Sequence, residues 1–240
     1  MIVAVWGQNK TGKSTFALTF PEDIVVFDFD LGVDRAIGRF NGKSITVHKI
    51  EVPIRLKGLK LAGSAEAWHS FEDKFSTACS SKKVKTIVID TGTQWYELCR
   101  FGYLQELQEN KARESLQPIE YGEVYARLRR IIQNARLADK HLVLTHYARD
   151  EYGVRLNPST GVKEDYRTGS LEMDGYKHTE GQADLVLYTF LRKVTLNSSG
   201  EKLKPVGRVC MSGIGLDLVD QELIEPSYEG IMNLVEMLNG

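Results

Sequence analysis

Residues 2–14 read Ile2-Val3-Ala4-Val5-Trp6-Gly7-Gln8-Asn9-Lys10-Thr11-Gly12-Lys13-Ser14. The apolar run 2–6 is of the kind that a buried parallel strand uses. Residues 7–14 match the pattern GxxxxGK(S/T) in full, and residues 14–20 favour a helix that Pro21 ends. A strand, this loop and a helix in that order predict a phosphate-binding loop of the Walker A type.

Each residue type in the predicted loop has a physical reason to bind a triphosphate. Gly7 and Gly12 let the backbone wrap closely with unusual dihedral angles, so that successive N–H groups point inward and attract an anion. We expect Lys13 to reach the β- and γ-phosphates of ATP and the Ser14 hydroxyl to ligate Mg²⁺. Thr15 could hold a base or a ribose, and a role in lining the helix is an equal alternative. The other nucleotide-binding candidates of the loop are Gln8, Asn9, Lys10 and Thr11.

Carboxylates follow two further apolar strands of the chain. Asp90 ends one of them, so its side chain should emerge at the carboxyl edge of the sheet, where open α/β folds bind ligands. We expect Asp90 to hold Mg²⁺ together with Ser14, and a cap on the next helix is the alternative. Asp28 and Asp30 end another strand and are expected to point to one face, with Asp30 as the general base for water. Capping of the following turn is the alternative for both.

His146 follows the predicted strand 142–145, which should bring it beside the phosphates. A polar side chain there can contact the γ-phosphate and report hydrolysis to the segment that follows. We therefore assign His146 a catalytic sensor role, with a structural histidine as the alternative. Residues 147–182 are polar, rich in Gly and Tyr, and show little periodicity. We expect a candidate DNA-binding or switch loop here, and a solvated loop is the alternative.

Strands and helices alternate along the chain as far as residue 146. Apolar residues recur at helical spacing over 64–78, 93–107, 121–138 and 227–238. The alternation predicts an α/β fold with a mostly parallel sheet that helices cover on both faces. Residues 193–211 are expected to add an antiparallel C-terminal hairpin with a turn at 197–200. We treat residues 1–240 as a single domain.

Composition limits the classes of partner. The 31 Lys and Arg residues against 32 Asp and Glu give a formal charge of −1, which excludes a protein coated in positive charge but permits a local basic face. The three cysteines form no CxxC pair, so neither a disulfide framework nor a structural zinc site is supported. No apolar run approaches the ~20 residues of a membrane span, and the N-terminus lacks the order of a signal peptide. We expect a cytoplasmic protein with no membrane partner.

The predicted C-terminal hairpin carries a local surplus of positive charge. Between residues 192 and 208, five basic residues oppose Glu201 alone. Such a patch favours phosphates, either of DNA or of the ATP on a neighbouring copy. Arg192 and Lys193 are the candidates for groups that act in trans, and a solvated hairpin face is the alternative.

Four motifs in this order resemble those of the RecA-like ATPases, and the nearest look-alikes are phage-encoded nucleotide-binding proteins of the single-strand-annealing, recombinase-like type. The matching residues are 7–14, 25–30, 87–91 and 142–146. The resemblance implies a RecA-like three-layer sandwich and a Mg²⁺-dependent ATPase of DNA recombination or single-strand annealing, in the host cytoplasm if phage-encoded. It also implies single-stranded DNA as a partner and a homo-oligomeric ring or filament with ATP between subunits. Glu is usual in the recombinases where this chain has Asp30, a difference that bears on the hydrolysis rate rather than on nucleotide binding.

Two other functions share the phosphate loop. A non-catalytic module that assembles on binding nucleotide stays open because Asp30 replaces the usual Glu. A small-molecule kinase would need an Arg-rich lid over the phosphates, and the segment 147–182 holds at least as many acidic as basic residues. Phosphate release with and without single-stranded DNA would separate these functions.

Overall fold

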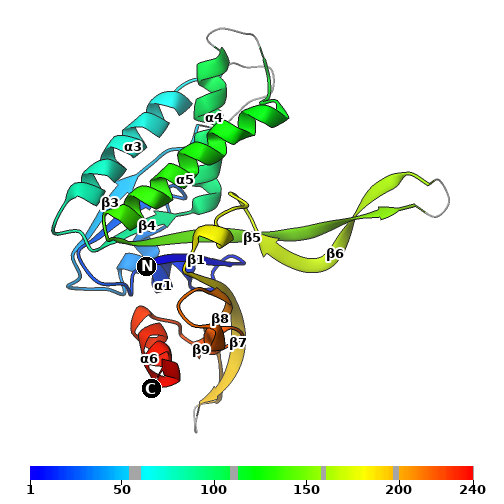
Figure 1. The fold of residues 1–240 in the computed structure, drawn as a ribbon. Coiled ribbons are helices and arrows are strands. Elements are labelled where there is room, and N and C mark those ends of the chain that lie inside the picture. The colour runs from blue at the N-terminus through cyan, green and yellow to red at the C-terminus, as the bar shows by residue number, and fades with distance from the viewer. Residues whose placement is uncertain (54–60, 109–112, 158–160, 197–199, 240) are drawn as a thin grey trace.

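The computed structural model describes residues 1–53, 61–108, 113–157, 161–196 and 200–239 (Figure 1). The first half alternates strands and helices: β1 (Ile2–Gly7), α1 (Lys13–Ala17), β2 (Ile24–Asp28), α2 (Asp34–Ile37), β3 (Ile45–Lys49), α3 (Ser64–Ser80), β4 (Thr86–Asp90), α4 (Gly92–Gln108) and α5 (Tyr121–Leu137). The second half is mainly β: β5 (His141–Leu156), β6 (Lys163–Met173), β7 (Leu185–Leu196), β8 (Gly200–Ser212) and β9 (Glu222–Ile224), followed by α6 (Tyr228–Asn239).

The strands form one mixed sheet in the order β3-β2-β4-β5-β1-β7-β8-β9, and β6 pairs with β5 outside this path. The pairs from β3 through to β7 are parallel, whereas β8 and β9 are added antiparallel. Strand β1 lies between β5 and β7, and β5 separates it from β4. Because these strands run in the same direction, the loop after β1 and the polar ends of β4 and β5 meet at one edge of the sheet.

Helices cover both faces of the sheet, with α3, α4 and α5 on one side and α1 and α6 on the other (Figure 1). The predicted apolar stripes of α3 and α5 are buried against the sheet, as at Trp68, Phe71, Leu128 and Ile131. Phe16 and Phe20 face the opposite core with Ile231 of α6. The predicted α/β three-layer class and the antiparallel C-terminal hairpin are confirmed, although residues 197–199 of its turn lie outside the described residues. No helix within the described ranges is long and apolar enough to cross a membrane.

The loop predicted over 147–182 is wrong for most of its length. Strand β5 does not end at Thr145 but continues to Leu156, and it pairs with β6 to form an antiparallel arm that projects from the body (Figure 1). Only the base of the arm, at Ala148, Leu171 and Met173, packs on the core. The described residues farther out are mostly exposed, so their polar composition resembles that of a loop. Cross-strand pairs stabilise the arm instead, such as Arg155 with Glu164 at 2.8 Å.

Candidate functional site

The loop between β1 and α1 is shaped by two glycines. Gly7 has φ +154°, and a Cβ on it would lie 2.2 Å from the carbonyl oxygen of Thr189 on β7. Gly12 has φ +93° and would bring a Cβ to 3.1 Å from Pro205 on β8. The Thr11 hydroxyl lies 2.8 Å from the Thr189 hydroxyl. The loop therefore packs directly on the C-terminal strands, and only glycine allows that approach.

Lys13 is bound within its own loop. Its Nζ donates hydrogen bonds to the carbonyl oxygens of Gly7 at 2.9 Å and Gln8 at 2.7 Å. Burial lowers the pKa of Lys13 to about 8, and the carboxylates of Asp90 and Asp30 oppose that shift. A buried cation whose hydrogen bonds go to neutral carbonyl groups gains from the arrival of an anion, so the lysine is poised to exchange these carbonyls for phosphate oxygens.

Asp90 and Ser14 bring hard oxygen donors together at the end of β4. Asp90 is buried and accepts hydrogen bonds from the hydroxyls of Ser14 and Thr145. Burial raises the pKa of the Asp90 carboxyl, with the carboxylates of Asp28 and Asp30 adding to the effect. A divalent cation would offset the unfavourable burial of this carboxylate beside two others. Mg²⁺ usually binds one or two protein oxygens, and waters and phosphates complete its coordination shell. The Ser14 and Asp90 oxygens therefore fit Mg²⁺.

The two acids after β2 differ from the expectation that both point to one face. Strand β2 ends at Asp28, whose buried carboxylate accepts hydrogen bonds at 3.2 Å from the backbone N–H groups of Gly32 and Val33. Asp28 is thus a turn cap, the alternative that the sequence left open. Asp30 lies beyond the strand, is exposed, and accepts a hydrogen bond from the Tyr147 hydroxyl. Because the chain turns at Asp30, strict strand alternation does not apply to it.

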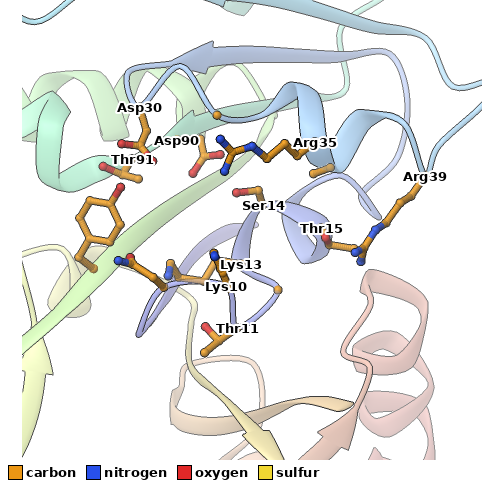
Figure 2. Close-up of a pocket in the computed structure, with 15 residues that line it drawn as sticks. Lys10, Thr11, Lys13, Ser14, Thr15, Asp30, Arg35, Arg39, Asp90 and Thr91 are labelled. Atoms are coloured by element: carbon orange, nitrogen blue, oxygen red, sulfur yellow. The ribbon is translucent and has the colours of Figure 1, made fainter. Parts of the chain in front are cut away.

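Lys13, Ser14, Asp30 and Asp90 line one cavity of about 540 Å³, whereas Asp28 does not reach it (Figure 2). Its wall includes loop residues 9–14 with Thr15, Asp30, Asp90 and Tyr147. Arg35 of α2 points toward Ser14 and Asp90, and Arg39 lies near Thr15, as Figure 2 shows. Sequence reasoning missed both arginines. The available signal was the spacing of four residues between the two arginines, which is typical of one helix face. That spacing does not predict whether the face lines a cavity.

His146 lies behind the wall of this cavity. Its ring is fully buried, and its Nδ1 donates to the carbonyl of Asp174 at 2.9 Å. Gly92 packs so closely that a Cβ there would lie 2.4 Å from the imidazole. Burial lowers the pKa of His146 to about 4, so the ring is neutral at pH 7. The next residue, Tyr147, is the one that lines the cavity, and a sensor role for His146 stays a prediction.

The two candidates for action in trans are consecutive residues of β7, and their side chains point to opposite faces of the C-terminal hairpin. Arg192 donates two hydrogen bonds to the carboxylate of Glu222 on β9, at 2.6 and 3.0 Å. Lys193 is on the opposite face of β7 and lies 3.4 Å from Glu201. Neither residue lines the cavity of its own chain, so a role in trans stays a prediction for both.

The family of the chain follows from a comparison with known sequences. The profile of the AAA domain family AAA_24 matches residues 1–213, which include the whole cavity wall. The chain belongs to the AAA domain family. This AAA domain is therefore a nucleotide-binding P-loop ATPase domain.

No curated protein sequence matches this AAA domain. Among solved structures, it is similar to the KaiC-like protein PH0186 from Pyrococcus horikoshii OT3, with 14% sequence identity and a TM-score of 0.44. The match covers 87% of this chain and 77% of the archaeal chain.

Proposed function

We propose that this AAA domain hydrolyses Mg²⁺–ATP and couples the reaction to single-stranded DNA in recombination or annealing, as in the phage recombinase-like proteins that its motifs resemble. One observation carries the nucleotide part of the proposal. Ser14 and Asp90 share a hydrogen bond in the same cavity into which the phosphate loop and Lys13 open. Phosphoryl transfer needs oxygen ligands for a cation, which Ser14 and Asp90 supply, and donors for the phosphates, which the loop amides and the Lys13 ammonium supply.

The residues of the cavity divide the work of hydrolysis. The loop amides and Lys13 bind the β- and γ-phosphates, and Arg35 approaches them from the opposite wall. Ser14 and Asp90 hold Mg²⁺, which when bound neutralises charge on the phosphate oxygens. Asp30 accepts the proton of the water that attacks the γ-phosphorus while the bond to the bridging oxygen breaks. The Tyr147 hydroxyl orients the Asp30 carboxylate.

Two strands connect the cavity to distant parts of the molecule, which supports coupling to a partner. Strand β5 carries Tyr147 at the cavity and continues into the β5–β6 arm. Strand β7 carries Thr189 against the phosphate loop and continues into the basic hairpin. A conformational change at the phosphates can therefore be transmitted along β5 to the arm or along β7 to the basic hairpin.

Assembly into a ring or filament of identical copies is part of the proposal. The arm exposes Tyr152, Val154 and Leu156, which alternate along β5 and share one of its faces. Three apolar side chains on a projecting arm suit contact with another copy. Arg192 or Lys193 of one copy would then reach the ATP of the next.

A small-molecule kinase is the less supported alternative. Such enzymes close a lid over the phosphates, and the segment considered for that role forms an arm that points away from the body (Figure 1). A non-catalytic module would bind nucleotide and assemble with negligible release of phosphate.

Phosphate release with and without single-stranded DNA tests the proposed function. We expect release to require Mg²⁺ and to rise several-fold when DNA is added, with a shift to larger species on a sizing column in ATP. Equal rates with and without DNA, together with no DNA binding at low salt, would reject the coupling. Phosphorylation of a nucleoside or nucleotide in a substrate panel would instead favour a kinase, and assembly without phosphate release would favour the non-catalytic module.

Nucleotide affinity is expected to fall as the pH rises through about 8, where free Lys13 loses its proton. A bound triphosphate favours the charged lysine and raises its pKa, so binding above this pH takes up a proton. The dissociation constant then rises by up to about tenfold per pH unit until the pKa of the complex is reached. Titration with a non-hydrolysable ATP analogue from about pH 7 to about pH 9.5 measures the profile. The variant Lys13→Arg should flatten it, because a guanidinium stays charged; a flat profile in the unaltered chain contradicts the assignment.

A further inference from the structure

The register of the C-terminal hairpin sorts its side chains onto two different faces. Cross-strand partners point to the same side of a sheet, and β7 and β8 pair Tyr188 with Arg208, Phe190 with Val206, Arg192 with Lys204 and Val194 with Lys202. Four of the five basic residues of the hairpin therefore share one face with both aromatic residues. Lys193 alone lies on the other face, paired across the strands with Leu203.

An aromatic row runs along the basic face. The rings of Tyr188 and Phe190 are stacked with centroids 5.6 Å apart, and Trp6 of β1 lies next to Tyr188 at 4.6 Å. Tyr188 and Phe190 are only partly buried. The guanidinium groups of Arg192 and Arg208 lie 5.2 and 5.7 Å from the centroid of the Phe190 ring. Aromatic rings with cations around them form the surface on which single-stranded bases stack.

The charge of this face is complementary to a phosphate backbone. Glu222 is the acidic residue that β9 contributes to it, and its carboxylate is shared between Arg192 and Arg208. Two guanidiniums around one carboxylate keep a net positive charge, and both arginine side chains remain about half exposed, at 45% and 46%. Lys204 pairs with Glu225, which lies just beyond β9. The acidic partners therefore hold the cations in place without cancelling the surplus.

The β5–β6 arm is less suited to the same ligand. Its arginines are paired with acids across the strands: Arg149 with Glu172, Arg155 with Glu164 and Arg167 with Asp150. Tyr166 packs closely over Gly153 and under the Arg155 guanidinium, so its ring already has contacts on the arm. Of the two projecting elements, the hairpin therefore carries both the surplus of positive charge and the aromatic row.

We infer that the Tyr188–Phe190 face of β7 and β8 is the binding surface for single-stranded nucleic acid, with bases stacked on the rings and phosphates held by Arg192, Lys202 and Arg208. This assignment rests on the proposed function, and it specifies where the proposed single-stranded DNA partner binds. The opposite face of the same two strands holds Thr189 and Pro205 against the phosphate loop. Nucleic acid and nucleotide would therefore contact opposite faces of the same two strands. A shift of these strands on binding one ligand would change the affinity for the other.

Binding of labelled oligo(dT) to the full chain, followed by fluorescence anisotropy with Mg²⁺ and a non-hydrolysable ATP analogue, tests the site. Phe190→Ala is expected to weaken binding by about tenfold or more, because one base loses its stacking partner. Leu191→Ala is the matched control, since it truncates an exposed apolar side chain on the opposite face. It should bind like the unaltered chain. The double variant Arg192→Gln with Lys202→Gln leaves the rings in place and should reduce the slope of log affinity against log salt by about 0.7 for each phosphate that no longer meets a cation.

The outcomes separate this inference from the proposed function. If the unaltered chain does not bind oligo(dT) at low salt, the coupling to DNA fails as a whole. If it binds and Phe190→Ala binds equally well, the site is elsewhere and the inference is overturned. Loss on Tyr166→Ala, which removes an exposed ring of the arm outside the proposed contact between copies, would place the site on the arm. Equal binding of duplex DNA would exclude base stacking. Thermal melting checks folding of each variant; should Phe190→Ala melt at a lower temperature than the unaltered chain, the double variant decides through its salt slope.

Discussion

Replacement of Lys13 by alanine is expected to lower phosphate release by roughly 10²–10³-fold, the effect of removing one charge-stabilising donor from an active site. The ammonium group is buried at the opening of the loop, where it donates to the carbonyls of Gly7 and Gln8. Without it, those carbonyls face the cavity and repel the phosphate oxygens. Analogue binding, measured by calorimetry, should weaken together with turnover, because the lysine contacts phosphate in the ground state as well as in the transition state.

The matched control for Lys13→Ala is Lys83→Ala, which removes an exposed lysine from the connection between α3 and β4. It should leave phosphate release unchanged. Normal turnover in Lys13→Ala would remove the cavity from consideration as the nucleotide site. Melting temperature gives a separate readout, and it should not fall in Lys13→Ala, because a buried cation with a lowered pKa is itself a cost to folding at neutral pH.

Replacement of Asp90 by asparagine should strongly lower Mg²⁺-dependent turnover and still make the nucleotide-free chain more stable. The carboxylate supplies a charged oxygen to the cation, and its loss should lower turnover by roughly hundredfold or more. The same charge is unfavourable in the free chain. Because burial raises the pKa of Asp90 above its unfolded value, the folded state loses stability as the pH rises through that unfolded value. At neutral pH the neutral amide removes this cost and can still accept from Thr145.

Thermal melting without Mg²⁺, run beside phosphate release with Mg²⁺, measures both effects of Asp90→Asn. Asp73→Asn on the exposed surface of α3 is the control for removal of one negative charge and should change neither quantity. A lower melting temperature together with retained turnover in Asp90→Asn would show that Asp90 only supports the fold.

The parts of the site that could be predicted from sequence are those that local chemistry specifies. The loop is one continuous motif with fixed spacing, and Asp90 ends a strand whose five residues are all buried. The structure brings both to one cavity. Arg35 and Arg39 could not be predicted, because α2 has only four residues and its position depends on the turn that Asp28 caps. Glu222 was also missed as the partner of Arg192, since it belongs to β9, a strand of three residues.

His146 and Tyr147 show how strand phase limits such predictions. Consecutive residues of a strand point to opposite faces, so an error of one position moves a side chain from the cavity to the core. Apolar composition located the strand but did not give its phase at the polar end. The same limit applied to the arm: Tyr152, Val154 and Leu156 alternate along β5, yet without a buried face the alternation was not recognised as a strand.

The contacts of Thr189 and Pro205 with the phosphate loop have a consequence for biosynthesis. The ribosome makes the eight residues of the loop about 175 and 190 residues before their supports, Thr189 and Pro205. A nascent chain that ends before β7 carries the whole motif but lacks the wall against which Gly7 and Gly12 pack. The nucleotide site is therefore completed only when β7 has docked beside β1 and β8 beside β7.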